Sequence, residues 1–321
     1  MRLKSRHLST LPISAVTVVM LLWSMNGISG APAKVSGYLG IPGLTKGKGS
    51  PWARIKNPSN GSAKVIGKVS NGCITGAEIL PKKGNGFVSI RRHRNRYYGH
   101  PDTVNLIKRL GDGLAKRTDK LLMVGDLAQP RGGKMSSMHR SHQNGLDADI
   151  WLSLAKSAYS AHRSTAGKKD PPTMVGKKKL TVNGRWGKHQ VYLVKTAASD
   201  PRVDRIFINP AIKRELCKTE KGDRKYLRKL RAWWGHHAHF HVRMKCPKGS
   251  PNCKQQPMIP VGEGCKSLAM WFRPKAKPKK IVKKKTTKKK KVKRRPPSPP
   301  PPGCIALLKK SYREIGNLAQ K

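Results

Sequence analysis

Histidine is concentrated in two short stretches of this 321-residue chain, and these stretches hold the residues best suited to chemistry. Six of the eleven histidines lie within residues 138–149 and 236–242. They are His139, His142, His236, His237, His239 and His241. Imidazole binds metal ions and accepts protons near neutral pH, so the two stretches indicate a metal site or a proton-transfer site. The alternative is that these histidines are solvated or structural.

His239 and His241 alternate with apolar neighbours in the second stretch. On a β-strand successive side chains point to opposite faces, so both imidazoles would share one face and reach one centre. On a helix the same residues would spread over a wide arc, and only His236 and His239 would align. The alternation therefore predicts a strand.

His142 and Asp149 are seven residues apart in the first stretch, with Gly145 between them. The glycine allows a turn, so a histidine before it and a carboxylate on the following strand can converge. Two imidazoles and one carboxylate are typical of a hydrolytic zinc site with a fourth position for water. Spacing leaves open whether Asp147 or Asp149 is the ligand, since both share one strand face. The two patterns together favour a zinc site over structural histidines.

Helices and strands that could position these stretches follow each other without a regular βαβ rhythm, which predicts an α+β fold. Apolar residues at helical spacing predict helices over residues 102–115 and 305–318. Short apolar runs predict strands at residues 121–125, 148–154, 191–194 and 203–208.

Composition divides the chain into five parts. Basic residues, an apolar run and then small residues predict a signal peptide for export, although an uncleaved membrane anchor is the alternative. The predicted parts are a signal peptide (1–33), a Gly-, Pro- and Lys-rich N-terminal arm (34–60), a folded enzyme domain (61–272), a basic and Pro-rich low-complexity segment (273–303) and a C-terminal helix (304–321).

All six cysteines lie beyond the predicted signal peptide, and their even number predicts three disulfides in an exported protein. The alternatives are reduced thiols or a zinc knuckle built from Cys246 and Cys253, but six intervening residues are too many for such a knuckle. A bond from Cys304 back to the folded region would turn the basic segment into a closed loop.

The formal net charge is +54, from 69 Lys and Arg against 15 Asp and Glu. Residues 273–295 alone contain 15 Lys or Arg and no acid. Such a segment can hold a protein against an anionic cell wall or membrane surface, or it can be a solvated spacer. Nucleic-acid binding is a competing function. The signal peptide, the even cysteine count and the lack of aromatic residues in the segment argue against it.

The HxxxxxxD and HxH patterns together resemble those of the LAS metallopeptidases, and the chain is more narrowly similar to the penicillin-insensitive murein endopeptidases. The narrower resemblance runs from residue 70 to Cys304 and includes residues 96–102, 141–143 and 209–213. It implies an α+β fold around a small antiparallel sheet, a periplasmic location, and hydrolysis of the D-alanyl to meso-diaminopimelyl cross-link of peptidoglycan. A D,D-carboxypeptidase acting through the same zinc site is the nearest enzymatic alternative.

The resemblance also assigns roles to individual residues. It implies a zinc ion on His142, Asp149 and His241, with His239 as the general base. His236 would orient water or stabilise the transition state.

A second metal position of the family corresponds to His139 and His189, together with an aspartate three residues before the latter. This chain has Trp186 there, so one zinc ion is expected and the second is left open. The implied disulfides are Cys73 with Cys304, Cys217 with Cys265 and Cys246 with Cys253.

Further residues near these motifs have two interpretations each. Tyr97, Tyr98, Trp233 and Trp234 could line a substrate groove, but core packing is the favoured reading. Asp126 could cap a turn or support the site, and the sequence does not decide between these.

Overall fold

The computed structural model describes residues 50–136, 139–167, 170–178, 180–273 and 298–319. The predicted signal peptide, most of the predicted N-terminal arm and nearly all of the basic segment lie outside these residues. Among the described helices, none combines the length and apolar character needed to cross a membrane.

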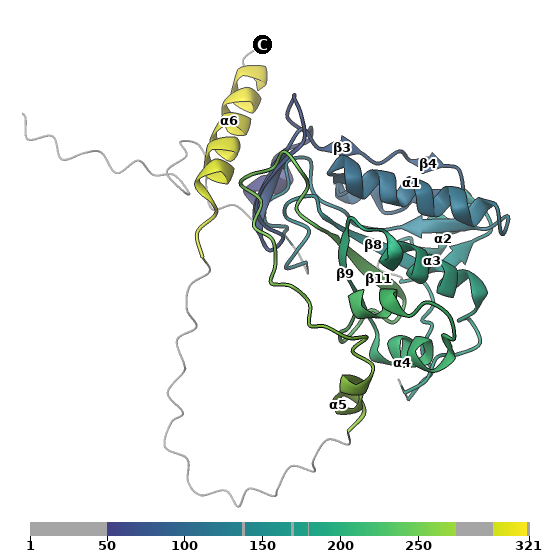
Figure 1. The fold of residues 1–321 in the computed structure, drawn as a ribbon. Helices are drawn as coiled ribbons and strands as arrows, with labels where there is room; N and C mark the ends of the chain where they lie inside the picture. The colour runs from purple at the N-terminus through teal and green to yellow at the C-terminus, as the bar shows by residue number, and fades with distance from the viewer. Residues whose placement is uncertain (1–49, 137–138, 168–169, 179, 274–297, 320–321) are drawn as a thin grey trace, which may run out of the picture.

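A seven-stranded sheet forms the centre of the molecule (Figure 1). Its strands in spatial order are β10 (Leu230–Ala232), β9 (Val203–Ile208), β11 (His239–Met244), β8 (Asp147–Ala155), β7 (Leu121–Val124), β5 (Phe87–Ser89) and β4 (Lys83–Gly84). The four central strands pair antiparallel, whereas β10 with β9 and β5 with β7 pair parallel. The α+β prediction is confirmed, and the sheet is larger and more mixed than the small antiparallel sheet that the resemblance implied.

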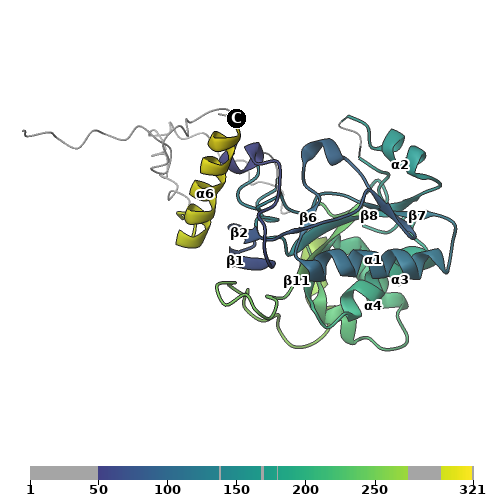
Figure 2. The ribbon, with the colours of Figure 1, turned by 90° about the horizontal axis from the view of Figure 1, so that it is seen from above.

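Helices cover both faces of this sheet (Figure 2). The described helices are α1 (Pro101–Ala115), α2 (Ala158–Ser164), α3 (Lys188–Ser199), α4 (Pro210–Thr219), α5 (Ala269–Phe272) and α6 (Pro302–Ala319). Apolar residues of α1, α3 and α4 pack with the sheet into the main core, while α2 packs on the other face. The strands therefore have one face in the main core and can present polar side chains on the other.

Short elements complete the fold. They are two small sheets, β1 (Lys64–Lys68) with β2 (Asn71–Thr75) and β3 (Glu78–Ile79) with β6 (Tyr98–Gly99), and the 3-10 helices η2 (Pro51–Arg54), η3 (Arg92–Arg94), η4 (Lys225–Lys229) and η5 (Lys266–Leu268).

The predicted helix at 102–115 and the predicted strands at 121–125, 148–154 and 203–208 are confirmed as α1, β7, β8 and β9. The strand predicted at 191–194 is wrong, because these residues lie within α3. Over a longer window the buried residues of α3 recur at helical spacing. Gln190 also accepts a hydrogen bond from the backbone N–H of Gly187, which stabilises the first turn.

The two ends of the described chain meet beside β1 and β2. Trp52 and Ile55, from the predicted arm, are buried in a small cluster with Leu308 of α6 and the Cys73–Cys304 disulfide. All three implied disulfides are present, the others being Cys217–Cys265 and Cys246–Cys253. The Cys73–Cys304 bond ties α6 to the folded body and makes the residues between them a closed loop.

Candidate metal and catalytic site

Strands β8 and β11 bring the two histidine-rich stretches together. Their antiparallel register places His241 directly opposite Asp149 and His239 opposite Trp151. Phe240 and Val242 point to the opposite face and are buried in the main core. The predicted strand with both imidazoles on one face is thereby confirmed, and it is anchored by the apolar residues between them.

The turn before β8 positions His142. Gly145 has φ 77°, in the left-handed region that favours glycine, and a Cβ there would lie 2.7 Å from Ile74 Cδ1. His142 has φ 66°, which is unusual for a residue with a side chain. Its backbone N–H donates to Asp147 Oδ2 over 3.1 Å. The turn therefore holds a strained histidine in place, as is typical of functional sites.

Three ligand atoms converge without satisfying one another. Asp149 Oδ1 lies 3.1 Å from His241 Nδ1 and 3.4 Å from His142 Nε2. All three residues are buried, yet His142 Nε2 and Asp149 Oδ1 have no hydrogen-bond partner. Buried polar atoms are rarely left unpaired, so this arrangement fits a metal ion.

The Asp147 carboxylate is paired with the guanidinium group of Arg243. Arg243 donates to both of its carboxylate oxygens, over 2.8 and 2.9 Å, and both residues are buried. Although burial opposes ionisation, the Arg243 charge keeps the pKa of Asp147 well below its usual range. Asp147 Oδ2 also lies 3.1 Å from His241 Nε2, although the geometry of this approach is not that of a hydrogen bond.

Two groups among the described residues have ligand atoms within 4.8 Å of one another, namely His139, His142 and Asp149, and His142, Asp147 and His241. The predicted ligands Asp149 and His241 are thus divided between the two groups, which share His142. Asp147 is the weaker ligand candidate of the two aspartates because Arg243 already neutralises it. Burial lowers the pKa of His241, but Asp147 and Asp149 outweigh burial and raise it to about 9. The space between the two carboxylates therefore favours a cation.

His239 and His236 lie beside these residues. The His239 side chain is 26% exposed, with Nε2 3.8 Å from Asp149 Oδ1, and its ring centroid is 5.0 Å from that of His236. Burial lowers the pKa of both imidazoles, that of His236 to about 4. Neutral imidazoles can accept a proton, as a general base must.

Asp126, which lies just after the end of β7, contacts His139 at the edge of the site. Its buried Oδ2 lies 3.1 Å from His139 Nε2 and accepts hydrogen bonds from Arg94 and Arg96. Burial opposes ionisation, but the bond to His139 and the charge of Arg96 lower the pKa of Asp126. The sequence left its role open, and the structure shows that it positions His139.

His189 stands apart from the other predicted metal ligands. It lies half-buried in the first turn of α3 and belongs to neither candidate metal group of the described residues. Trp186, where the resemblance implied an aspartate, packs against the main core. The structure therefore brings together His139, His142, Asp149, His236, His239 and His241, but not His189.

Aromatic residues flank the site. The favoured prediction of core packing holds for buried Tyr98, but it is wrong for Trp233 and Trp234, whose side chains are 56% and 63% exposed. The Trp233 ring contacts Phe207 edge-on, at 5.7 Å between centroids, and Phe207 in turn contacts His241 at 5.5 Å.

Sequence reasoning missed two residues of the site. Arg243 holds Asp147, and the Trp151 ring contacts that of His239 at 5.1 Å between centroids. The spacing of the HxH motif offered a signal for Arg243, because it continues the alternation that places His239 and His241 on one strand face.

Comparison with known proteins agrees with this geometry. Residues 65–309 match the family model described as penicillin-insensitive murein endopeptidase. The penicillin-insensitive murein endopeptidase of Haemophilus influenzae is 44% identical over 228 residues, which cover 70% of this chain and 79% of that protein. The proteins of the same name from Pectobacterium atrosepticum (44% identity, 70% and 80% coverage) and Yersinia enterocolitica (43%, 72% and 85%) are similarly related. The chain belongs to the penicillin-insensitive murein endopeptidase family.

Proposed function

We propose that this chain is a zinc-dependent endopeptidase that hydrolyses the D-alanyl to meso-diaminopimelyl cross-link of peptidoglycan in the periplasm. The observation that carries the proposal is the convergence of His142 Nε2, Asp149 Oδ1 and His241 Nδ1, buried and close together while His142 Nε2 and Asp149 Oδ1 lack hydrogen bonds. Family membership supports the choice of peptidoglycan as substrate.

These three residues would hold one zinc ion, with the fourth position left for water and substrate. Zinc bound there supplies Lewis acidity, which lowers the pKa of a water molecule to about 7 and polarises the scissile carbonyl group. The second zinc position is not part of the proposal, because Trp186 replaces a carboxylate and the described position of His189 lies outside both candidate groups.

His239 is the proposed general base. Burial lowers its pKa, which favours the neutral imidazole, and the ring is partly exposed and next to the Asp149 carboxylate, so it can take the proton of the attacking water and return it to the leaving amine. His236 is the proposed partner that orients water or stabilises charge in the transition state. Its Nδ1 lies 3.0 Å from the carbonyl oxygen of Trp234, a contact that restrains the ring and does not use Nε2.

The test is digestion of purified sacculi, with the soluble products separated by chromatography. We expect the wild type to remove cross-linked dimers. In His239→Ala the rate of dimer cleavage should fall by a factor of about 100 or more. Exposed His237, which lies in the same stretch but outside the metal groups of the described residues, gives the matched control His237→Ala, for which we expect an unchanged rate.

A D,D-carboxypeptidase on the same site is the alternative. It would release only terminal D-alanine and leave cross-linked dimers intact. That product pattern would contradict the endopeptidase proposal while preserving the zinc site.

A further inference from the structure

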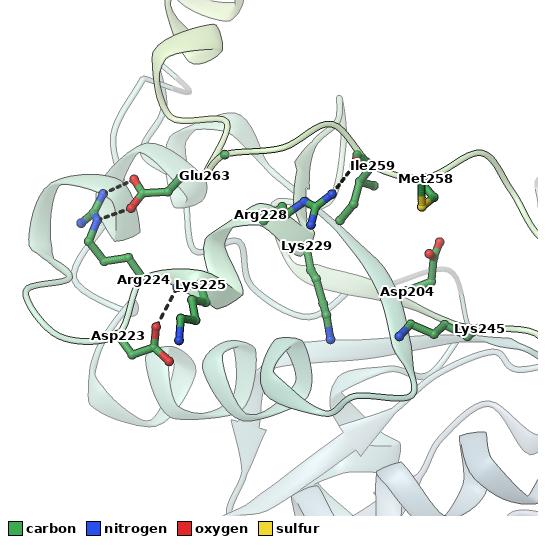
Figure 3. Close-up of a pocket in the computed structure, with 11 residues that line it drawn as sticks. Asp204, Asp223, Arg224, Lys225, Arg228, Lys229, Lys245, Met258, Ile259 and Glu263 are labelled. Atoms are coloured by element: carbon green, nitrogen blue, oxygen red, sulfur yellow. Dashed lines mark hydrogen bonds and ion pairs between the residues drawn. The ribbon is translucent and has the colours of Figure 1, made fainter.

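A cavity, drawn in Figure 3, lies beside the ends of β9 and β11 that are farther from His239 and His241. It has a volume of about 690 Å³ and is lined by η4, by Asp204 of β9, by Lys245 after β11 and by residues 258–263. Lys245 follows His241 by four positions along an extended chain, which corresponds to roughly 13 Å. This cavity, the η4 pocket, is therefore distinct from the candidate metal site, and its volume suits a small molecule or a peptide end.

The acidic groups of the η4 pocket already have partners. Glu263 pairs with Arg224 through two bonds of 2.7 Å, and Asp204 accepts a bond of 2.6 Å from Arg205. Asp223 accepts a hydrogen bond from the backbone N–H of Lys225. These carboxylates cannot offset the remaining positive charge of the pocket in full.

Four cations remain without an ion pair within the described part of the chain, namely Lys225, Arg228, Lys229 and Lys245. The Arg228 guanidinium donates to the carbonyl oxygens of Ile259 and Pro260, which fixes its position and leaves its charge uncompensated. Lys229 Nζ donates to the carbonyl oxygen of Asp200 in the same way.

Lys229 and Lys245 reach the pocket from different elements. Figure 3 shows their ammonium groups on the same side of the cavity. Burial first, and then repulsion from the charge of Lys245, lowers the pKa of Lys229, and the carboxylates of Asp200 and Asp204 offset these effects only in part. An anion between them would relieve this repulsion.

An apolar rim faces these cations. The Met258 side chain is 91% exposed, and half-buried Ile259 lies next to it. A ligand that combines an anionic group with a small aliphatic side chain would satisfy both parts of the pocket. The carboxyl end of a peptide that terminates in alanine has this chemistry.

We propose that the η4 pocket binds the free carboxylate end of a peptidoglycan stem peptide, with Lys229 and Lys245 at the carboxylate and Met258 and Ile259 at the alanyl methyl group. The identity of the peptide rests on the proposed function. Binding here would hold the enzyme on its polymer at a point away from the bond that is cleaved.

The Met258 methyl group gives a local probe. We would label the methionine methyl groups of the full chain with carbon-13, assign the Met258 signal with Met258→Leu, and titrate N-acetyl-L-alanyl-D-alanine. The expected result is a saturable shift of the Met258 signal. The C-terminal amide of the same dipeptide should produce no such shift, because it lacks the carboxylate.

Two charge reversals form a matched pair. Lys245→Glu should weaken the dipeptide affinity about tenfold or more. Lys248→Glu, at an exposed lysine outside the pocket, should leave it unchanged. The other methionine signals report whether each variant is folded.

Several outcomes would overturn the proposal. They are an equal shift from the amide, a shift from inorganic phosphate but none from the dipeptide, no Met258 shift at all, or equal weakening by both charge reversals. The readout does not require cleavage. A Met258 response without sacculus digestion would contradict only the proposed function, and digestion without a Met258 response would contradict only this pocket.

Discussion

At the candidate metal site, one buried carboxylate contacts several neighbours at once. This carboxylate is that of Asp147, which binds Arg243 through both oxygens, receives the backbone N–H of His142 and lies beside His241. Asp147 therefore fixes the backbone of one proposed ligand, His142, and lies close to the ring of another, His241. Its charge is tolerated because Arg243 is buried beside it, and neither residue would be stable there alone.

Arg243→Met should therefore destabilise the protein by about 3–5 kcal/mol, because it leaves the Asp147 charge buried without its partner. Urea unfolding measures this change. The double variant Asp147→Asn with Arg243→Met should recover much of the loss. If the single and double variants were equally destabilised, the pairing would not be the source of the effect.

At the scale of elements, the register of β8 against β11 and the turn that precedes β8 create the site. The register follows from apolar residues, since Phe240 and Val242 must enter the main core and thereby turn His239 and His241 to the other face. The turn depends on the backbone conformation of Gly145 and on its close approach to Ile74.

Gly145→Ala tests the turn. Alanine at this position would have a strained left-handed backbone, and its Cβ would also lie only 2.7 Å from Ile74 Cδ1. Gly61→Ala is the matched control, because Gly61 also has a positive φ, 91°, but nothing lies within 4 Å of its Cβ. We expect the control to lose about 1–2 kcal/mol of unfolding free energy, and Gly145→Ala to lose more. Equal losses would show that the close approach is unimportant.

Asp200, at the end of α3, links three elements through Arg109 of α1 and Arg202 before β9. Burial opposes ionisation, but hydrogen bonds from Arg202 and Arg109 lower its pKa to about 2. Because the folded pKa lies below the unfolded one, its stabilisation is full above about pH 4 and is lost as the pH falls through about 2.

Asp200→Asn should therefore be less stable than the wild type at pH 6, and the difference should shrink at pH 3. Urea unfolding of both proteins at the two pH values measures it. A difference that does not change with pH would show that the ionised carboxylate is not responsible.

Much of this arrangement follows from local sequence. The HxH alternation predicted β11, and Gly145 predicted the turn. The prediction for residues 191–194 was wrong because these four residues resemble a strand when considered alone. Their helical pattern becomes visible only over the full length of α3. The Asp147–Arg243 pair spans 96 residues and the Asp126–His139 contact joins separate elements. The local alternation could therefore place Arg243 on the strand face of His239 and His241, but it could not predict either contact. Spacing alone did not choose between Asp147 and Asp149, whereas the family resemblance favoured Asp149, and the position of Arg243 beside Asp147 supports that choice.

At the scale of the whole molecule, α6 and the Cys73–Cys304 bond return the chain to the body of the enzyme. The proposed wall-binding segment, residues 273–295, lies between α5 and α6, and only its first residue is among those described. Both ends of this segment thus attach to folded structure. The 15 basic residues of such a loop could bind an anionic surface without changing the packing of the main core.

Deleting residues 274–295 should weaken binding to sacculi at low salt and abolish most of its salt dependence, because the deleted charges are screened as ionic strength rises. Sedimentation of the protein with sacculi across a salt series measures both effects. Binding that is unchanged by the deletion would identify the segment as a spacer.

The central claim is that His142, Asp149 and His241 hold one zinc ion. Metal analysis and native mass spectrometry of the wild type, His142→Ala and His239→Ala test it most directly, since they do not depend on activity. We expect about one zinc ion per chain in the wild type and in His239→Ala, but almost none in His142→Ala. Full zinc content in His142→Ala, or its loss in His239→Ala alone, would contradict the assignment.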